Sequence, residues 1–440
     1  MALKFEEWQR AVLTMNRDRI AMRCKQTLVI VSLWLGIGSL TLPFWMSAAY
    51  AQGETSNPAE TVSHAVGTPL KAAQELFKQQ KYREALDKLD EVPSANRTPN
   101  EIYAIERTRA AIATASGDDQ LALKAYLAVV ATGRLSADDQ LKFIQSIGYL
   151  YFRQSDYAQS AAWLERFFKE GGVDAKSREL LVRSYYMNND FQHAAAELQI
   201  DLDTAKQTGA APTEEQLRVL INLAVKQNDK PAYVHALEQF VTYYPSKKYW
   251  TDLLTRLQTR ADFSSRLALD FYRLKFSMRL MADASDYMNM AQLSMLAGFP
   301  TEAKKVMERG YQSTVLGVGP DSGKQKNLLD VVTKMAFEDS KSMDRSAGDE
   351  QKAKDGIGLI NLGYAHVTLD QFDTGLAMME KGIVTPGLKH VDDAKLHLAT
   401  AYALAGRTER AIEAFKTVQR SDGSADLARY WALQLTHPIP

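Results

Sequence analysis

Residues 143–168, FIQSIGYLYFRQSDYAQSAAWLERFF, decide the fold of this chain because they encode two helices joined by a short polar turn. Apolar and small residues recur at helical spacing on both sides of the turn, so each half is expected to bury one face. Gly148 in the first half and Ser160 in the second are small enough to let two antiparallel helices approach closely. The space between this pair and the next would be filled by the large residues Tyr151, Leu164 and Phe167.

The same pattern of small and large residues recurs along most of the chain from about residue 66 onward. No segment shows sustained alternation of apolar and polar residues, so β-strands are not expected. Where consecutive units are clear, the small residue of the second helix returns after 34 to 38 residues. This spacing predicts a stack of helix pairs in which each pair contacts its neighbours. The positions of the small residue are Ala85, Ala122, Ser160, Ala194, Ala303, Gly375 and Ala411.

These units resemble the tetratricopeptide repeat (TPR), a helix–turn–helix motif of about 34 residues. Pro245, at the end of residues 236–245 (ALEQFVTYYP), matches the proline that closes the motif in that family. Most other units lack this proline, and none has the tryptophan of the family's first helix, so the repeats are degenerate. The resemblance covers most of residues 66–435, and the weaker stretches 250–258 and 266–276 still predict a helix pair. It implies an all-α, TPR-like helix–turn–helix solenoid, coiled as a right-handed superhelix of about nine helix pairs.

The composition along the chain predicts five segments. A glycine-rich stretch at residues 313–323 (STVLGVGPDSG) interrupts the repeats and is the expected hinge or boundary, and a longer helix follows it. The five segments are a signal peptide at 1–51, a flexible leader at 52–65, an N-terminal TPR-like array at 66–312, an interrupting loop and helix at 313–355, and C-terminal TPR-like repeats at 356–440.

The N-terminal segment has the three parts of a secretory signal. Residues 27–51 (TLVIVSLWLGIGSLTLPFWMSAAYA) carry no charge, follow the basic cluster from Arg17 to Lys25, and end in an Ala-Tyr-Ala motif typical of cleavage sites. The alternative is an uncleaved signal anchor, because residues 27–46 are just long enough to span a bilayer. The charged region is long for a signal, so the start codon is left open among Met1, Met15 and Met22.

Either form of the signal places most of the chain across the membrane. The whole sequence resembles the exported TPR proteins of Gram-negative bacteria, and this resemblance implies a periplasmic location. The alternative is an inner-membrane anchor that carries a periplasmic domain. Contact with the membrane is then expected only through an uncleaved N-terminus, since no second apolar run of that length occurs.

Overall charge and cysteine content exclude several classes of function. The chain has 53 basic and 53 acidic residues, so no excess of positive charge is present to neutralise phosphates, and nucleic-acid binding is not expected. The single cysteine, Cys24, precedes the apolar run and would be lost with a cleaved signal. Disulfides, thiolate metal sites and cysteine nucleophiles are therefore not expected in the mature protein.

Residues typical of catalytic, phosphate-binding or metal sites are not arranged in the required patterns. The glycine-rich stretch before Lys324 is not a phosphate-binding loop. That loop needs a glycine where Val318 stands, a serine or threonine where Gln325 stands, and a strand before it, which is not predicted here. His390 and His397 are seven residues apart without a clear third ligand, which favours surface or groove positions over a metal site. We therefore expect no enzyme activity, no cofactor and no metal.

The resemblance to TPR proteins also implies where binding would occur, because in that family the first helices of successive units line the concave side. The inward-facing positions of the two clearest units form a basic and aromatic set, which is typical of interface hot spots. A third unit would add Arg218, Asn222 and Lys226. The ten residues of the two clearest units are Lys142, Gln145, Tyr149, Phe152, Arg153, Lys176, Glu179, Arg183, Tyr186 and Met187.

This set is expected to receive an extended or helical peptide of acidic character. The family's carboxylate clamp, which grips a free C-terminus, needs an asparagine where Tyr149 and Arg183 stand, so that mode of binding is not expected. The alternative is that these side chains only cover the surface of the array.

Three functional hypotheses follow. The first is a periplasmic scaffold or adaptor that docks proteins of the cell envelope during assembly or transport, because some proteins with this resemblance accompany energy-coupled transport systems of the envelope. The second is a carrier or sensor for a glycan or lipid fragment, which would need an enclosed pocket. The third, an enzyme on the inner face of a helical solenoid, is disfavoured because no polar catalytic cluster is present.

Overall fold

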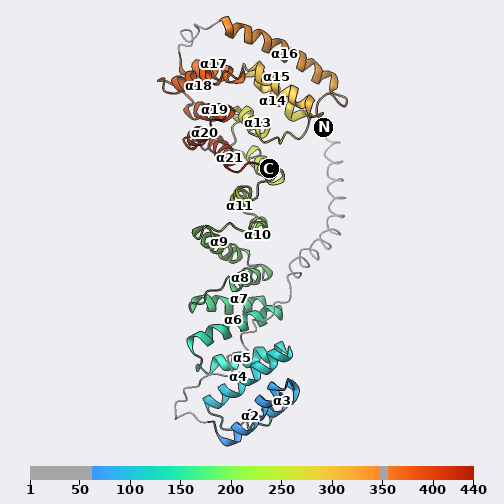
Figure 1. Ribbon diagram of the computed structural model, residues 1–440, viewed down its shortest axis with the longest axis vertical. Helices are drawn as coiled ribbons and strands as arrows, with labels where there is room; N and C mark the ends of the chain where they lie inside the picture. Colours follow the sequence, from blue (N-terminus) through green and yellow to red (C-terminus); the bar gives the residue numbers. More distant parts are fainter. Residues whose placement is uncertain (1–61, 346–354) are drawn as a thin grey trace.

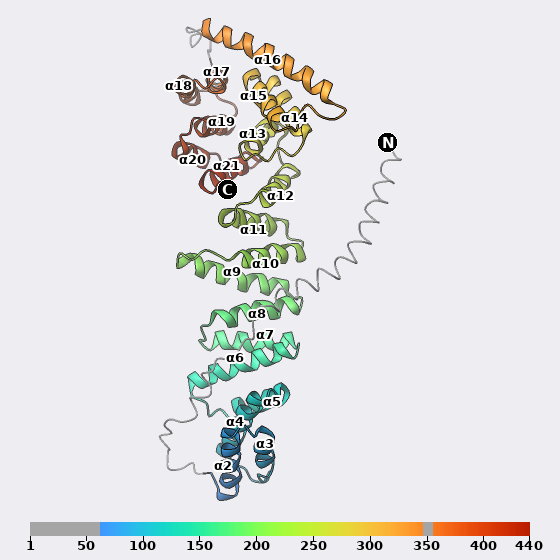
Figure 2. The same cartoon turned by 45° about the vertical axis from the view of Figure 1, so that its right-hand side comes forward.

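The computed structural model describes residues 62–345 and 355–440, so the predicted signal peptide and most of the leader lie outside the described residues. The described residues form twenty α-helices and one short 3-10 helix, and they contain no strand. This confirms the predicted all-α, TPR-like fold. Figures 1 and 2 show an elongated stack with α2 at one end and α16 at the other. The hand of the superhelix stays a prediction.

Sixteen of the helices form eight closely packed antiparallel pairs. The pairs are α2 His64–Lys78 with α3 Tyr82–Asp90, α4 Pro99–Ser116 with α5 Asp119–Ala131, α6 Ala137–Arg153 with α7 Tyr157–Lys169, α8 Ala175–Met187 with α9 Phe191–Gln207, α10 Glu214–Lys226 with α11 Lys230–Tyr243, α14 Ala284–Leu296 with α15 Pro300–Gln312, α17 Gly356–Thr368 with α18 Phe372–Ile383, and α19 Val391–Leu404 with α20 Thr408–Lys416.

The remaining four helices lie outside these eight pairs, although α16 packs closely on α15. The pair predicted at 250–258 and 266–276 corresponds to α12 and α13, but α12 packs mainly on α11, and α13 packs on α14 and α21. A connection that contains the 3-10 helix η2 separates the two. The bounds of these elements are α12 Lys247–Gln258, η2 Ser265–Leu267, α13 Ala268–Ser277, α16 Ser322–Arg345 and α21 Ser424–Thr436.

Each of the eight pairs closes with the same kind of turn. One residue of the turn adopts a left-handed backbone conformation, and the next amide donates a hydrogen bond to the carbonyl five residues earlier, as in Asp156 to Tyr151 at 3.0 Å. This arrangement satisfies carbonyl groups that the end of a helix would otherwise leave unpaired. It requires a residue that tolerates positive φ, which favours glycine and asparagine. The left-handed residues are Gln80, Gly117, Ser155, Asn189, Asn228, Gly298, Asp370 and Gly406.

The first pair predicted from the sequence shows why small residues stand at the crossings. Ser160 is fully buried, and its hydroxyl donates a hydrogen bond to the carbonyl oxygen of Gly148 at 2.8 Å. A Cβ atom on Gly148 would lie 2.8 Å from Leu164, which is closer than packed carbon atoms approach. The close approach predicted for α6 and α7 is therefore confirmed, and Leu164 and Phe167 are buried beside it as expected.

The C-terminal helices return to the stack instead of extending it. Figures 1 and 2 show α17 to α21 alongside α12 to α15, with α16 across the end. Trp250 on α12 contacts Tyr430 on α21 at 6.2 Å between ring centroids, and the Ser264 amide donates to the Asp422 carbonyl at 2.9 Å. One apolar core runs from Leu237 on α11 through to α21. The position of a boundary at 313–323 stays a prediction.

Within residues 62–345 and 355–440, no helix combines the length and the apolar composition required to cross a lipid bilayer.

Candidate functional site

The ten residues predicted to line the groove lie on two neighbouring first helices, five on α6 and five on α8, which contact each other. None of them is buried, and the three further residues on α10 are exposed. We call the surface formed by these thirteen residues of α6, α8 and α10 the first-helix face. The register predicted from the repeats therefore places all of them on the surface. The exposed members of the ten are Lys142, Arg153, Lys176, Glu179 and Met187, and the others are half-buried.

Aromatic rings and cations of the first-helix face contact one another and two rings at the starts of α7 and α9, and these contacts connect successive units. The ring of Phe152, on the last turn of α6, lies 5.3 Å from that of Tyr157 in an edge-to-face arrangement. The guanidinium of Arg183, from the next first helix, lies over Phe152 at 5.2 Å. A similar arrangement joins the next two units. The ring of Tyr186 on α8 lies 5.6 Å from that of Phe191, and the ammonium group of Lys226 on α10 lies over Phe191 at 5.7 Å. Such contacts stabilise the stack and present cations beside aromatic rings.

Polar side chains also join successive units. Gln145 Nε2 donates to Ser177 Oγ at 2.7 Å and to Asp174 Oδ2 at 3.1 Å, which ties α6 to the start of α8. The hydroxyl of Tyr186 donates to Asn222 Oδ1 at 2.9 Å. Arg153 forms an ion pair with Asp119 of the preceding unit at 3.0 Å. These contacts reduce the freedom of four predicted groove residues and fix their orientation before any ligand binds.

The environment of the face also alters two titratable groups. Burial lowers the pKa of Arg183, and the carboxylate of Glu179 partly opposes this effect. Burial raises the pKa of Tyr186. Arg183 nevertheless stays charged at neutral pH, because arginine loses its proton only in strongly basic solution. A partly desolvated cation beside a ring interacts strongly with a carboxylate.

Two lysines and one methionine of the first-helix face stay open to solvent, as does Val225, which precedes Lys226 on α10. Among the described residues, neither Lys176 nor Lys226 has a carboxylate within ion-pair distance, whereas Arg218 is paired with Glu214 at 2.6 Å. Met187 is 43% exposed and Val225 is 58% exposed, both on the last turn of a first helix. The repeat register did not include Val225 among the predicted groove residues. Its place next to Lys226 at the end of α10 is a signal that could have identified it.

A second group of charged residues lies buried where the C-terminal helices return to the stack. Arg273 on α13 donates through Nε and Nη2 to the two carboxylate oxygens of Glu302 on α15, at 2.8 and 2.9 Å. Its Nη1 donates to Asp270 Oδ1 at 2.9 Å. Tyr364 on α17 donates its hydroxyl to Glu302 Oε1 at 3.2 Å, and His397 Nε2 on α19 lies 3.2 Å from Asp270 Oδ1. We call these five residues the buried ionic cluster.

The buried ionic cluster has the properties of a structural network. Burial raises the pKa of Asp270, but the neighbouring His397 and Arg273 outweigh burial and lower this pKa to about 2. Burial opposes the charge of Arg273, but the carboxylates of Glu302 and Asp270 hold the pKa of Arg273 well above its usual range. Burial raises the pKa of Tyr364. Mutual compensation of buried charges, as between Arg273 and the carboxylates of Asp270 and Glu302, is typical of a structural ion-pair network.

His397 differs from the expectation of a surface or groove histidine. Its ring nitrogen contacts the buried carboxylate of Asp270, and only part of its side chain reaches solvent. The expected absence of a metal site at His390 and His397 stays a prediction. Within the part of the chain that the structure describes, no three histidine, cysteine, aspartate or glutamate side chains are grouped so that they could hold a metal ion.

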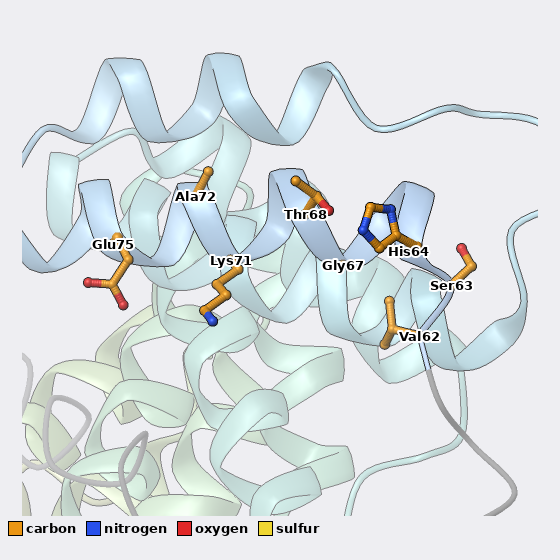
Figure 3. Close-up of a pocket in the computed structure, with 8 residues that line it drawn as sticks. All are labelled: Val62, Ser63, His64, Gly67, Thr68, Lys71, Ala72 and Glu75. Carbon is orange, nitrogen blue, oxygen red and sulfur yellow. The ribbon is translucent and has the colours of Figure 1, made fainter.

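A hollow of about 360 Å³ lies on the surface of α2, at the first end of the stack (Figure 3). All of its lining residues belong to α2 or to the two residues before it, so it has a single wall. Glu75, one of them, is paired with Lys78 at 2.9 Å. The hollow does not bring together groups from different elements, and it lies away from the first-helix face. It therefore provides neither a catalytic site nor an enclosed pocket for a small ligand.

Comparison with known proteins gives a family match over part of the chain. Residues 146–204, which extend from α6 to α9, match the tetratricopeptide repeat family. This segment contains most of the two units predicted to line the groove. None of the curated protein sequences is similar enough to this chain to count as a match.

Several solved structures are similar to this chain at low sequence identity. A tetratricopeptide repeat protein from Parabacteroides merdae ATCC 43184 is 10% identical, with 77% of this chain and 99% of that chain covered and a TM-score of 0.29. Yeast Tom70 is 11% identical, with 84% and 95% covered and a TM-score of 0.23. The TPR2AB domain of yeast Sti1, in a complex with pHSP90, is 11% identical, with 67% and 98% covered and a TM-score of 0.22.

Proposed function

We propose that this protein is a non-enzymatic scaffold that binds a peptide segment of a protein partner on the first-helix face of α6, α8 and α10. Stacked helix pairs form extended surfaces that suit the binding of other proteins. The segment that matches the tetratricopeptide repeat family, residues 146–204, carries eight of the ten residues of the two clearest units. The buried ionic cluster and the hollow on α2 offer no alternative site with the geometry for catalysis.

The observation that carries this proposal is the chemistry left open on the first-helix face. Lys176 and Lys226 have no carboxylate partner among the described residues, and Met187 and Val225 are exposed apolar side chains. Arg183 adds a partly desolvated cation held over an aromatic ring. A peptide that carries carboxylates and a few apolar side chains would complement this surface. The partner segment is therefore proposed to be acidic with apolar anchors.

The cellular setting of this scaffold is proposed from the N-terminal sequence. The uncharged stretch at 27–51 and the basic residues before it support export to the periplasm, with retention in the inner membrane as the alternative. The partner would then be a protein of the cell envelope, bound during assembly or transport. Sequencing the N-terminus of the mature protein distinguishes a cleaved signal from a retained anchor.

The proposal is tested by reversing the two open lysines together. Peptides would first be selected from a random display library on the purified protein, and the proposal expects them to be rich in aspartate and glutamate. The double variant Lys176→Glu/Lys226→Glu is expected to bind such a peptide at least about tenfold more weakly, because two attractive charge contacts become repulsive. Fluorescence anisotropy with a labelled selected peptide measures the dissociation constant.

A matched control carries the same change of net charge away from the face. Lys124 on α5 and Lys169 on α7 are exposed residues of second helices, and the double variant Lys124→Glu/Lys169→Glu is expected to retain the wild-type affinity to within a factor of about two. Equal weakening by both double variants, or selected peptides without an excess of acidic residues, would count against the proposal. Far-UV circular dichroism confirms that both variants keep the helical fold.

A further inference from the structure

Helix α16 presents a flank on which two apolar side chains, Val331 and Met335, are exposed, while Leu328 on the same flank partly packs against the main apolar core. The helix lies at the end of the molecule opposite α2, as both views show (Figures 1 and 2). One side of it packs on α15, where Val332 and Ala336 are buried. On a neighbouring flank Val331 is 50% exposed, Met335 is 47% exposed, and Leu328 is half-buried. Apolar side chains gathered on one exposed flank are typical of an interaction surface.

The spacing of this flank has a regular pattern. Lys324, Leu328, Val331, Met335 and Glu338 follow one another at intervals of four, three, four and three residues. On an α-helix this spacing places all five on one stripe, as in the contact seam of a coiled coil. The stripe, which we call the α16 stripe, begins with a lysine, ends with a glutamate and has three apolar residues between them.

We propose that the α16 stripe binds the α16 stripe of a second copy of this chain in an antiparallel arrangement. A two-fold axis near Val331 would place Leu328 of each copy opposite Met335 of the other. The same axis would bring Lys324 of each copy opposite Glu338 of the other, so both ends of the contact would be attractive. A parallel arrangement would instead place like charges side by side. The charge order along the stripe therefore favours a second copy in the antiparallel orientation.

The charged ends of the stripe are open to a second copy. Glu338 is exposed and has no ion-pair partner among the described residues. Lys324 is paired at 2.8 Å with Asp321, but both side chains are largely exposed, and such pairs contribute little to stability. Replacing the Lys324–Asp321 ion pair with a contact to a second copy therefore costs little free energy.

The size of the stripe bounds the strength of the association. Three apolar side chains and two charged residues per copy form a contact smaller than the roughly 1,200 Å² at which stable complexes begin. The dimer is therefore expected to be weak and to depend on protein concentration. Because the stripe lies at the end of the stack, two copies joined there would leave the first-helix face of each copy open.

Sedimentation velocity of the purified full chain over a range of concentrations tests this proposal. The wild type is expected to change from monomer to dimer as the concentration rises, and Val331→Lys is expected to weaken the dimer at least about tenfold. Lys324→Glu and Glu338→Lys are each expected to weaken it, because each places like charges at both ends of the contact. An equimolar mixture of these two single variants is expected to associate again, since the two charge patterns are complementary.

Phe337→Ser is the matched control on the same helix. Phe337 is exposed but lies on a different flank, about a third of a turn from Val331, beside Thr301 and Leu369. Its replacement is expected to leave the association unchanged. A wild type that stays monomeric at the highest concentration reached would overturn the proposal and assign the stripe to another occupant. A dimer that withstands both single charge reversals would also overturn it.

The variant of the first-helix face, Lys176→Glu/Lys226→Glu, is expected to dimerise like the wild type. Dimerisation and peptide binding can therefore fail independently of each other.

Discussion

Replacing Glu302 with glutamine is expected to lower the free energy of unfolding of the C-terminal helices by about 3–5 kcal/mol. Glu302 accepts two hydrogen bonds from Arg273 and one from Tyr364, and all three residues are buried. Glutamine keeps the shape of the side chain but removes the negative charge that compensates the guanidinium. Taking this partner away leaves the buried guanidinium with Asp270 as its remaining carboxylate among the described residues, so its charge is only partly compensated. Incomplete compensation of a buried charge costs more than the ion pair itself contributes. Urea denaturation followed by tryptophan fluorescence measures the change, since Trp250 and Trp431 are buried in the same core.

Glu308→Gln is the matched control for this prediction. Glu308 lies on the same helix, α15, and forms an exposed ion pair with Lys304 at 3.7 Å. Exposed pairs of this kind contribute little, so the control is expected to change the free energy of unfolding by less than about 0.5 kcal/mol. A similar small effect for Glu302→Gln would show that the buried ionic cluster does not hold the C-terminal helices to the stack.

Replacing Gly363 with valine is expected to destabilise the pair α17 and α18 by about 3 kcal/mol or more. The two helices cross at Gly363 and Gly375, and a Cβ atom on Gly363 would lie 2.5 Å from the carbonyl oxygen of Gly375. The obstacle is backbone, which cannot turn aside as a long side chain can, so the helices must separate. Separation would also disturb Tyr364, the next residue, and its contact with the buried ionic cluster. Hydrogen exchange of the backbone amides of α17 and α18 would detect this loss locally.

Gly323→Ala tests the same kind of change where space is available. Gly323 lies in the first turn of α16, and no atom would come within 4 Å of an added Cβ. Alanine favours a helix over glycine by up to about 1 kcal/mol, so this variant is expected to be neutral or slightly more stable. If Gly363→Val were as stable as the wild type, the glycine crossing would not determine the distance between α17 and α18.

The repeat pattern could be predicted because its determinants are local in the sequence. Small residues recur where helices cross, as at Gly148 and Ser160 or at Gly363 and Gly375, and the helical period marks the buried faces. The turns between paired helices also have a signal in the sequence, since six of the eight left-handed residues are glycine, asparagine or aspartate. Gln80 and Ser155 adopt the same conformation without such a signal, because the hydrogen bonds of the turn stabilise it there.

The return of the C-terminal helices could not be predicted because it depends on contacts between residues that are distant in the sequence. Asp270 and Arg273 have the composition of an ordinary exposed helix face, and only their partners Glu302 and His397 explain their burial. The conformation of the glycine-rich loop at 313–323 also depends on a contact that its own composition does not predict. The amide of Gly317 donates to the Gln325 side chain at 2.7 Å, which ties the loop to the start of α16.

The surface position of the ten predicted residues could be derived from the sequence, whereas the contacts that they make could not; that they form a binding site stays a prediction. The repeat register placed ten residues on the surface of α6 and α8. It could not show that Phe152, Arg183 and Tyr186 also connect successive units, because those contacts depend on how the units stack. Residues with both roles are poor choices for testing binding, since their removal also weakens the stack. Lys176 and Met187 are better probes because both side chains are exposed, whereas Lys226 is exposed but also lies over the ring of Phe191.

Photo-crosslinking from position 187 tests peptide binding on the first-helix face most directly. A photoreactive phenylalanine analogue would replace Met187, or, in a control, Val173, which is 95% exposed on the loop between α7 and α8. Each protein would be irradiated with a selected acidic peptide, and mass spectrometry would measure the yield of crosslinked product. Binding on the face predicts efficient crosslinking from position 187 that excess unlabelled peptide suppresses, and little from position 173. Equal yields from the two positions, or a product from position 173 alone, would contradict it.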